Sequence, residues 1–372
     1  MIPFLAIRSR NETETTYLFE TAERVMRRNL NRIGISFCIL GAATVAIMIV
    51  YWILHETERA EVEAEWKEKK TTRILPYELG STERLSILPL VNWHAAPGFR
   101  SEMGVSYLIR TDHTTILFDA GQNANEENPS PLLHNMSRSG ISLSEIDAIF
   151  ISHLHFDHVG GKKWERNGTF SLGNEQIVLS GKKIFTPVTL SYPGNAPMRI
   201  DGPTVLYPGI ASIGPISRRL FMGRVDEQAL AVNVLGKGIV LVSGCGHQTL
   251  RKILERTENT FSERIYGIVG DLHYPVPSGR LEKFGINLQR VFASGEGPLK
   301  TLRWADVEND LGVLKKMNLS ILGIGGHDSS DETIRFFERN FEDSYRRVVV
   351  GKWIHVSPTI PKEKGEKNAH DL

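Results

Sequence analysis

The chain has 372 residues, of which 41% are hydrophobic and 23% charged, so it can hold one large folded domain or two ordinary ones. Its formal net charge of +1 at pH 7 argues against a nucleic-acid-binding protein. The two cysteines, Cys38 and Cys245, lie in an apolar run and in a glycine-rich motif, so no disulfide framework is expected.

The first 73 residues form three segments that differ in polarity and charge. Residues 1–32 are polar and predict a short tail. Residues 33–54, IGISFCILGAATVAIMIVYWIL, contain no charged side chain. A bilayer core of about 30 Å needs about 20 apolar helical residues, so this segment is predicted to cross a membrane once. Residues 55–73 are dense in charge and rich in helix formers, which predicts a solvated helical stalk.

Two alternatives to a membrane anchor exist for residues 33–54. A signal peptide fits poorly, because the apolar core is long and no A-x-A-like site follows it. A buried helix of a soluble domain is the other alternative. The positive-inside tendency favours a cytoplasmic N-terminus, since more basic residues lie immediately before the segment than immediately after it. Those before it are Arg24, Arg27, Arg28 and Arg32; Arg59 follows closely, and Lys67, Lys69, Lys70 and Arg73, farther out, weaken the bias.

From residue 74 to residue 358 the composition is that of a folded domain, whereas 359–372 has almost no apolar content and is predicted to be disordered. Helix signals and short apolar runs alternate along this region, which predicts an α/β layered fold. The predicted strands are 105–110, 115–119, 147–151, 229–234, 238–243, 265–270 and 319–324. The predicted helices are 130–139, 250–257 and 332–341.

The most informative motif, Ile151-Ser-His-Leu-His-Phe-Asp-His-Val-Gly-Gly161, follows one of these strands. Alternate residues of an extended segment project to the same side, so His153 and His155 can bind one ion while Asp157 and His158 turn towards a second. Imidazole and carboxylate groups are common ligands of divalent metals. A histidine-rich surface loop without a ligand is the alternative.

Similar polar residues follow other predicted strands. Gly-Cys-Gly-His247, Asp271-Leu-His273 and Gly-Gly-His327 each come directly after an apolar run, and Asp119 ends the run at 115–119. A single histidine after a strand is more often structural. Because several such residues recur at the same place in successive strands, the sequence predicts a metal site at one edge of a sheet.

In this order the motifs resemble those of the metallo-β-lactamase-fold metallohydrolases. They are most similar to the branch labelled dihydropterin-ribofuranosylaminobenzene-phosphate synthase. The motifs that carry the resemblance are Gly104-Val-Ser, Leu117-Phe-Asp-Ala-Gly, the histidine run at 151–161, Asp226-Glu-Gln-Ala-Leu and Gly244-Cys-Gly-His. The resemblance implies a four-layer αββα sandwich with a one- or two-metal site, here preceded by a single transmembrane helix.

The resemblance also implies roles for individual residues. The first metal would be held by His153, His155 and His247, and the second by Asp157, His158 and His327. Asp119 would accept backbone hydrogen bonds and brace the ligand loop without binding metal.

Two departures from the branch pattern affect the second site. Asp271-Leu-His273 stands where the branch has Gly-Phe-His, so Asp271 is expected to bridge the ions, or His273 to face the substrate or bind metal. His327-Asp-Ser-Ser replaces His-Cys-Thr-Gly, so the pocket beside this histidine is expected to differ.

The predicted function is a membrane-anchored metal-dependent hydrolase. A metal-bound hydroxide would attack an ester, phosphoester or lactone of a small anionic or lipid-like substrate, with Asp157, Asp271 and His273 as the catalytic residues. Zinc suits the imidazole-rich first site, and zinc, iron or manganese the more oxygen-rich second. One alternative is a transferase of the synthase type; another is a non-catalytic metal-binding module. The sequence does not fix the oligomeric state.

Two further segments bear on the substrate. Ser329-Ser-Asp-Glu332 has capping-box spacing before the helix at 332–341, whose N-terminal amides favour an anion near the metals; a well-capped helix without a ligand is the equal alternative. Residues 276–305 are longer than an ordinary connection, which favours a lid over the site; a membrane-facing or disordered insertion is the alternative.

Overall fold

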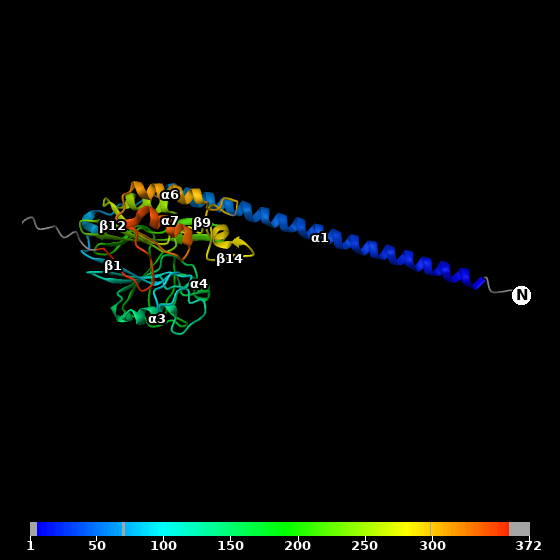
Figure 1. Cartoon of the computed structure of the whole chain (residues 1–372), viewed down its shortest axis with the longest axis horizontal. Helices are drawn as coiled ribbons and strands as arrows, with labels where there is room; N and C mark the ends of the chain where they lie inside the picture. Colours follow the sequence, from blue (N-terminus) through cyan, green and yellow to red (C-terminus); the bar gives the residue numbers. More distant parts are fainter. Residues whose placement is uncertain (1–5, 69–70, 298, 357–372) are drawn as a thin grey trace, which may run out of the picture. The chain divides into compact units, whose positions relative to one another are not determined.

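The computed structural model describes residues 6–68, 71–297 and 299–356. By its internal contacts the chain forms two compact units, Met1–Ala60 and Glu61–Leu372, and the boundary falls within the first helix, α1 (Ala6–Glu68; Figure 1). Residues 6–68, which include the predicted membrane segment and most of the predicted tail and stalk, therefore lie along one continuous helix with no break at residue 33 or 55; the last residues of the predicted stalk, 71–73, are not helical. The C-terminal tail predicted at 359–372 lies outside the described residues.

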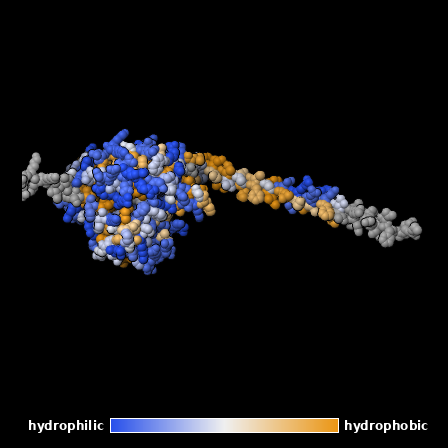
Figure 2. All heavy atoms as spheres, in the orientation of Figure 1, coloured by the Kyte–Doolittle hydropathy of each residue, from blue (hydrophilic) through white to orange (hydrophobic). Residues whose placement is uncertain are grey.

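The middle of α1 is an exposed apolar surface. The part of this helix from Thr16 to Glu68 contains a stretch with a mean hydropathy of 2.5, none of it buried. Figure 2 shows these apolar side chains as a hydrophobic band on the helix. By length and composition α1 is a candidate membrane span, although an N-terminal signal sequence meets the same criteria.

Two β-sheets form the centre of the second unit. One is seven-stranded, in the order β17-β1-β2-β3-β4-β5-β6, and the other is six-stranded, in the order β16-β13-β12-β11-β8-β7. The strands of the first are β1 (Leu85–Val91), β2 (Ser106–Thr111), β3 (Thr115–Phe118), β4 (Ala148–Phe150), β5 (Lys183–Thr186), β6 (Met198–Arg199) and β17 (Ile354–Val356). Those of the second are β7 (Thr204–Tyr207), β8 (Ile210–Ser212), β11 (Leu230–Val234), β12 (Gly238–Ser243), β13 (Ile265–Gly270) and β16 (Ile321–Ile324).

Helices cover the outer face of each sheet (Figure 1). Buried residues of α3 (Pro131–Arg138) and α4 (Lys162–Arg166) pack in one hydrophobic cluster with the seven-stranded sheet. A second cluster joins the six-stranded sheet to three other helices, which are α5 (Leu250–Thr260), α6 (Trp304–Lys316) and α7 (Asp331–Phe341). A third lies between the two sheets. The predicted αββα sandwich is confirmed.

The sequence of β12 shows why the layers form. Successive side chains of a strand point to opposite faces. Accordingly, Ile239 and Leu241 enter the cluster beneath the helices, whereas Val240 and Val242 enter the cluster between the sheets. A strand that is buried on both faces has a continuous run of apolar residues rather than an alternating pattern. The continuous run at 238–243 therefore predicts a buried strand.

Several shorter elements complete the fold. They are α2 (Pro76–Leu79), the hairpins β9 (Ile216–Leu220) with β10 (Gly223–Glu227) and β14 (Glu282–Lys283) with β15 (Ile286–Asn287), and the helical turns η1 (Leu143–Glu145), η2 (Gln289–Ala293) and η3 (Glu342–Ser344). The insertion at 276–305 therefore carries a small hairpin and a helical turn.

One predicted helix start needs correction. The capping-box spacing placed Ser329 at the start of the helix, but the N-cap is Ser330, whose hydroxyl accepts a hydrogen bond from Thr333 N. The Ser329 hydroxyl instead accepts a hydrogen bond from Tyr274 N in a neighbouring loop. A tertiary contact thus shifts the cap by one residue.

Candidate metal centre

The metal-binding motifs follow parallel strands. In the seven-stranded sheet β3, β4 and β5 are parallel, and in the six-stranded sheet β12, β13 and β16 are parallel. The carboxyl ends of parallel strands meet at one edge, so the loops after them come together there. Two of these loops approach so closely that only glycine fits: a Cβ at Gly244 would collide with the Ser152 hydroxyl, and one at Gly325 with the Asp271 carboxylate.

Within the described residues, four overlapping groups of side chains each place their ligand atoms within 4.8 Å of one another. The groups are His153, His155 and His247; Asp157, His158 and His327; His153, His158 and Cys245; and Cys245, His247, His273 and Asp328. The first two groups are the two ligand sets predicted from the sequence. The structure brings all six of those residues together.

The first group is an imidazole cluster. His153 Nε2 lies 3.0 Å from His155 Nδ1, and the ring centroids of His153 and His155 lie 5.1 and 5.0 Å from that of His247. Burial together with the neighbouring imidazoles holds the pKa of His153 and His247 well below the usual range. Burial also lowers the pKa of His155 to about 4. These rings are therefore neutral near pH 7, which is the state in which imidazole binds a metal.

The second group combines an imidazole pair with a carboxylate. His327 Nε2 lies 3.3 Å from Asp157 Oδ2, and the His158 and His327 ring centroids are 5.3 Å apart. Burial acts to lower the pKa of His327, but Asp328 and Asp157 outweigh it and raise that pKa well above its usual value. The carboxylates thus create a negative potential that favours a cation at this position.

The fourth group contains two residues that were not predicted as ligands. The Cys245 thiol donates a hydrogen bond to Asp328 Oδ2 at 2.7 Å, and His273 Nδ1 lies 3.0 Å from the same oxygen. Burial and the adjacent Asp328 and Asp157 carboxylates raise the pKa of Cys245 well above its usual value. The sequence signals were the cysteine inside Gly-Cys-Gly-His and the aspartate directly after His327.

Asp119 lies where the resemblance to the family implied. Its carboxylate accepts hydrogen bonds from Ser152 N at 2.7 Å and from the Ser152 hydroxyl at 2.6 Å. Its Oδ2 also lies 2.6 Å from His158 Nδ1. With Nδ1 donating to this carboxylate, the other ring nitrogen of His158 is directed away from it, towards Cys245 Sγ at 3.1 Å.

Glu227 and Gln228, which were not singled out as site residues, connect the ligand loops. The fully buried Glu227 carboxylate accepts hydrogen bonds from three successive backbone amides, those of Cys245, Gly246 and His247, at 2.9, 2.9 and 2.7 Å. Gln228 N donates to Ser152 O, and its side chain donates to Ile151 O. The available signal was the motif Asp226-Glu-Gln-Ala-Leu, in which both residues come shortly before an apolar run.

Asp271, predicted to bridge the two ions, is in none of the four groups within the described chain. Its carboxylate accepts hydrogen bonds from Asn92 Nδ2 and from Asp328 N, both at 3.3 Å. Burial raises its pKa to about 6. Asp271 thus supports the loop that carries Asp328, and metal binding by Asp271 stays a prediction.

The donor set fits divalent ions. Asp157 Oδ1 and His273 Nε2 are buried and have no hydrogen-bond partner among the described residues. An unpaired buried polar atom is unfavourable, and a metal ion would satisfy both. Neutral imidazoles, carboxylates and a thiol converging from separate strands are ligands suited to zinc and similar metals.

Comparisons with known proteins agree with the fold. Residues 100–166 match the model of the metallo-β-lactamase superfamily. A 7,8-dihydropterin-6-methyl-4-(β-D-ribofuranosyl)-aminobenzene-5'-phosphate synthase from Methanocaldococcus jannaschii is 24% identical over 324 residues, which cover 74% of this chain and 98% of the relative.

Two solved structures are similar to the chain. Tm1679, a metal-dependent hydrolase of the β-lactamase superfamily, has a TM-score of 0.50 and 20% identity, covering 73% of this chain and 99% of that one. The metallo-β-lactamase fold protein YhfI from Bacillus subtilis has a TM-score of 0.45 and 12% identity, covering 74% and 100%.

The chain is a metallo-β-lactamase-fold protein. The resemblance predicted from the motifs is confirmed at the level of the superfamily, and the branch label predicted from them is the one that the curated relative carries.

Proposed function

We propose that the protein is a membrane-anchored metal-dependent hydrolase that cleaves an ester, phosphoester or lactone of a small anionic or lipid-like substrate. The observation that supports this proposal most directly is the convergence of buried, neutral imidazoles with Asp157 and Asp328 at one sheet edge. Divalent ions bound there would activate a water molecule and polarise the substrate oxygen. Zinc suits the imidazole group, and zinc, iron or manganese the carboxylate-containing group.

Different residues would bind the metals, orient the attacking water and contact the substrate. His153, His155 and His247 would hold the first ion; Asp157, His158 and His327 would hold the second. Asp157 would also orient the attacking water, and the absence of a hydrogen-bond partner for its Oδ1 among the described residues supports this role. His273, in contact with Asp328 and next to His247, would act on the substrate side.

The contacts of the insertion at 276–305 support a role as a lid over the metal centre. Arg280 donates hydrogen bonds to Gly326 O and Ser329 O, both at 2.7 Å, on either side of His327 and Asp328. Gln289 donates to the Asp328 carboxylate, and Ala293 O lies 3.2 Å from His247 Nδ1. The insertion thus packs directly on the ligand loops and would exclude water from the reaction.

A cavity beside the centre supports an anionic substrate. A small cavity of about 50 Å³ is lined in part by His247 and His273, and a larger one of about 660 Å³ shares Arg218, Thr249 and Asp310 with it. Five basic and three acidic residues line the larger cavity, so it carries a positive excess. The basic ones are Arg218, Arg251, Arg290, Lys300 and Arg303.

The synthase-type transferase is the second candidate. It is favoured by the similarity to the Methanocaldococcus jannaschii synthase, which spans nearly all of that relative. An apolar helix such as 33–54 is not required by that reaction, and the cavity chemistry favours an anion in both cases. Product analysis separates the two: hydrolysis yields an acid and an alcohol, joined in one hydroxy acid where the substrate is a lactone, whereas transfer yields a coupled product.

The test is metal content of the purified full-length chain by elemental analysis, with turnover on a panel of phosphoesters and lactones. We expect two equivalents of metal, falling in His155→Ala and His247→Ala, and turnover lost with them. His113→Ala, at an exposed turn, is the control and should keep both. Folded protein without metal, or variants with unchanged metal and turnover, would exclude the hydrolase.

A further inference from the structure

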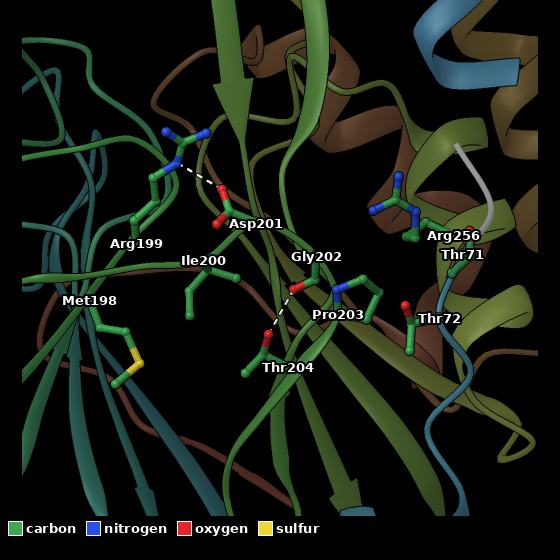
Figure 3. Close-up of a pocket in the computed structure, with 10 residues that line it drawn as sticks. All are labelled: Thr71, Thr72, Met198, Arg199, Ile200, Asp201, Gly202, Pro203, Thr204 and Arg256. Atoms are coloured by element: carbon green, nitrogen blue, oxygen red, sulfur yellow. Dashed lines mark hydrogen bonds and ion pairs between the residues drawn. The ribbon is translucent and has the colours of Figure 1, made fainter. Parts of the chain in front are cut away.

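A third cavity lies away from the metal centre. It has a volume of about 490 Å³ and is formed where β6 and β7, at the edges of the two sheets, meet α5 and the residues that follow α1 (Figure 3). Its polar lining consists of Thr71, Thr72, Arg199, Asp201, Thr204 and Arg256. None of these residues belongs to the metal-ligand groups.

Arg256 is the unusual residue of this cavity. Its side chain is only 2% exposed, and its guanidinium makes one hydrogen bond within the described chain, from Nη1 to Ile213 O at 3.1 Å. Its Nε is buried without a partner. Among the described residues no carboxylate lies within ion-pair distance of it, and the Trp66 ring lies 4.9 Å from the guanidinium carbon. Burial lowers the pKa of Arg256 despite the opposing charge of Glu255. A buried charge without a counter-charge is unfavourable unless a ligand supplies one.

The surroundings of Arg256 offer further donors. Thr71 and Thr72 place hydroxyl groups at the cavity wall, and Arg199 lies across it (Figure 3). Arg199 pairs with Asp201 at 2.8 Å, but both side chains are mostly exposed, 57% and 75%. Such exposed pairs are weak, so Arg199 can turn towards a ligand.

We infer that this cavity binds a phosphate group, held by Arg256 with Arg199 and the threonine hydroxyls. Guanidinium groups match the oxygen geometry of phosphate and form charge-assisted hydrogen bonds with it. The ligand is free phosphate, or the phosphomonoester group of a lipid headgroup. The site is separate from the proposed reaction.

The site also joins the end of α1 to the sandwich. Trp66 covers Arg256, while Glu63 pairs with Lys252 at 2.8 Å and Glu65 with Arg224 at 3.0 Å. A phosphate that neutralises Arg256 therefore stabilises the packing of residues 61–68 and 71–72 on the sheets. Binding is expected to raise the thermal stability of the whole second unit.

The experiment measures the melting temperature and isothermal titration heat of the full-length, metal-loaded chain with inorganic phosphate, at ionic strength held constant with chloride. Phosphate should bind saturably and raise the melting temperature. Arg256→Met should weaken this binding roughly tenfold or more, because charge-assisted hydrogen bonds are lost. Arg335→Met, at an exposed position of α7, should behave as the wild type.

Further variants separate this site from the metal centre and from misfolding. Arg256→Lys keeps the charge and should retain intermediate affinity. His155→Ala should keep the phosphate response that depends on Arg256, whatever its effect on turnover. The inference is overturned if phosphate has no effect on the wild type, or if Arg256→Met binds it equally well at the same number of sites.

The source of the phosphate is resolved in phosphatidylcholine nanodiscs with and without phosphatidic acid. If the headgroup is the ligand, phosphatidic acid should raise the melting temperature of the wild type but not of Arg256→Met, and free phosphate should add little. If phosphatidic acid is inert while free phosphate acts, the ligand is soluble. If neither acts, the inference is wrong.

Discussion

Asp119 fixes the ligand loop through a single carboxylate. It binds both the amide and the hydroxyl of Ser152, and it orients the His158 ring. Burial raises the pKa of this carboxyl, and the His158 and Ser152 contacts oppose that rise, so the contacts are what keep the anion available. Asp119 is in none of the candidate metal-ligand groups of the described residues, yet it determines which ring nitrogen of His158 faces the centre.

Asp119→Asn should therefore lower metal affinity by about 10- to 100-fold while leaving the fold intact, because the amide cannot accept all three hydrogen bonds. Competition with a chromophoric chelator on the full-length chain measures this. Asp343→Asn changes an exposed carboxylate in η3, outside the ligand loops, and should have no effect. Equal affinity in the two variants would show that Asp119 does not support the centre.

The site residues differ in how they could be identified from the sequence. His247 and His327 were found by their place after apolar runs, and the resemblance to the family assigned them as ligands. His153, His155, Asp157 and His158 lie close together in the chain, so spacing alone identified them. The contact of Cys245 with Asp328 joins residues 83 positions apart, and it exists only because β12, β13 and β16 are parallel neighbours. No local pattern encodes that proximity.

At the scale of elements, the buried strands were predictable and the insertion was not. β12 and β13 form apolar runs because both faces of each are covered. The hairpin β14–β15 is short, and its apolar residues Phe284 and Ile286 are exposed, so it has no buried apolar run. It is held instead by tertiary hydrogen bonds such as those of Arg280, which depend on the position of the His327 loop.

Substitution of Arg280 tests the proposal that the insertion at 276–305 is a lid. Its side chain is 8% exposed and also pairs with Asp331 at 2.6 Å. Arg280→Ala should weaken closure of the insertion by about 1.5–3 kcal/mol, the usual contribution of hydrogen bonds to charged groups. We expect faster proteolysis within 276–305 and lower kcat/KM, with unchanged metal content.

Lys283→Ala, at an exposed position of β14, is the matched control for Arg280→Ala and should leave both the cleavage rate and turnover as in the wild type. If the protease cleaves the Arg280→Ala variant no faster than this control, the insertion is not held over the centre by Arg280.

For the whole molecule, the sandwich and the metal centre lie entirely in the second unit, whereas residues 33–54 lie in the first. Membrane attachment and metal chemistry should therefore respond to different substitutions. The exposed apolar side chains of α1 include Leu40 and Val45 near the middle of the predicted span, with 64% and 56% exposure. A soluble helix with such a surface would expose a large apolar patch to water, which folded soluble proteins rarely do.

The double substitution Leu40→Lys with Val45→Lys should release the chain from membranes, because a lysine near the bilayer centre costs about 2.5–3.5 kcal/mol on insertion scales. Alkaline extraction of membranes measures the released fraction, and elemental analysis should find the same metal content per chain as in the wild type. Leu18→Lys with Val25→Lys adds the same charge to exposed positions of α1 outside residues 33–54 and should leave the chain membrane-bound. Release of both variants alike would mean that residues 33–54 are not the anchor, whereas loss of metal in the first alone would mean that the two units depend on each other.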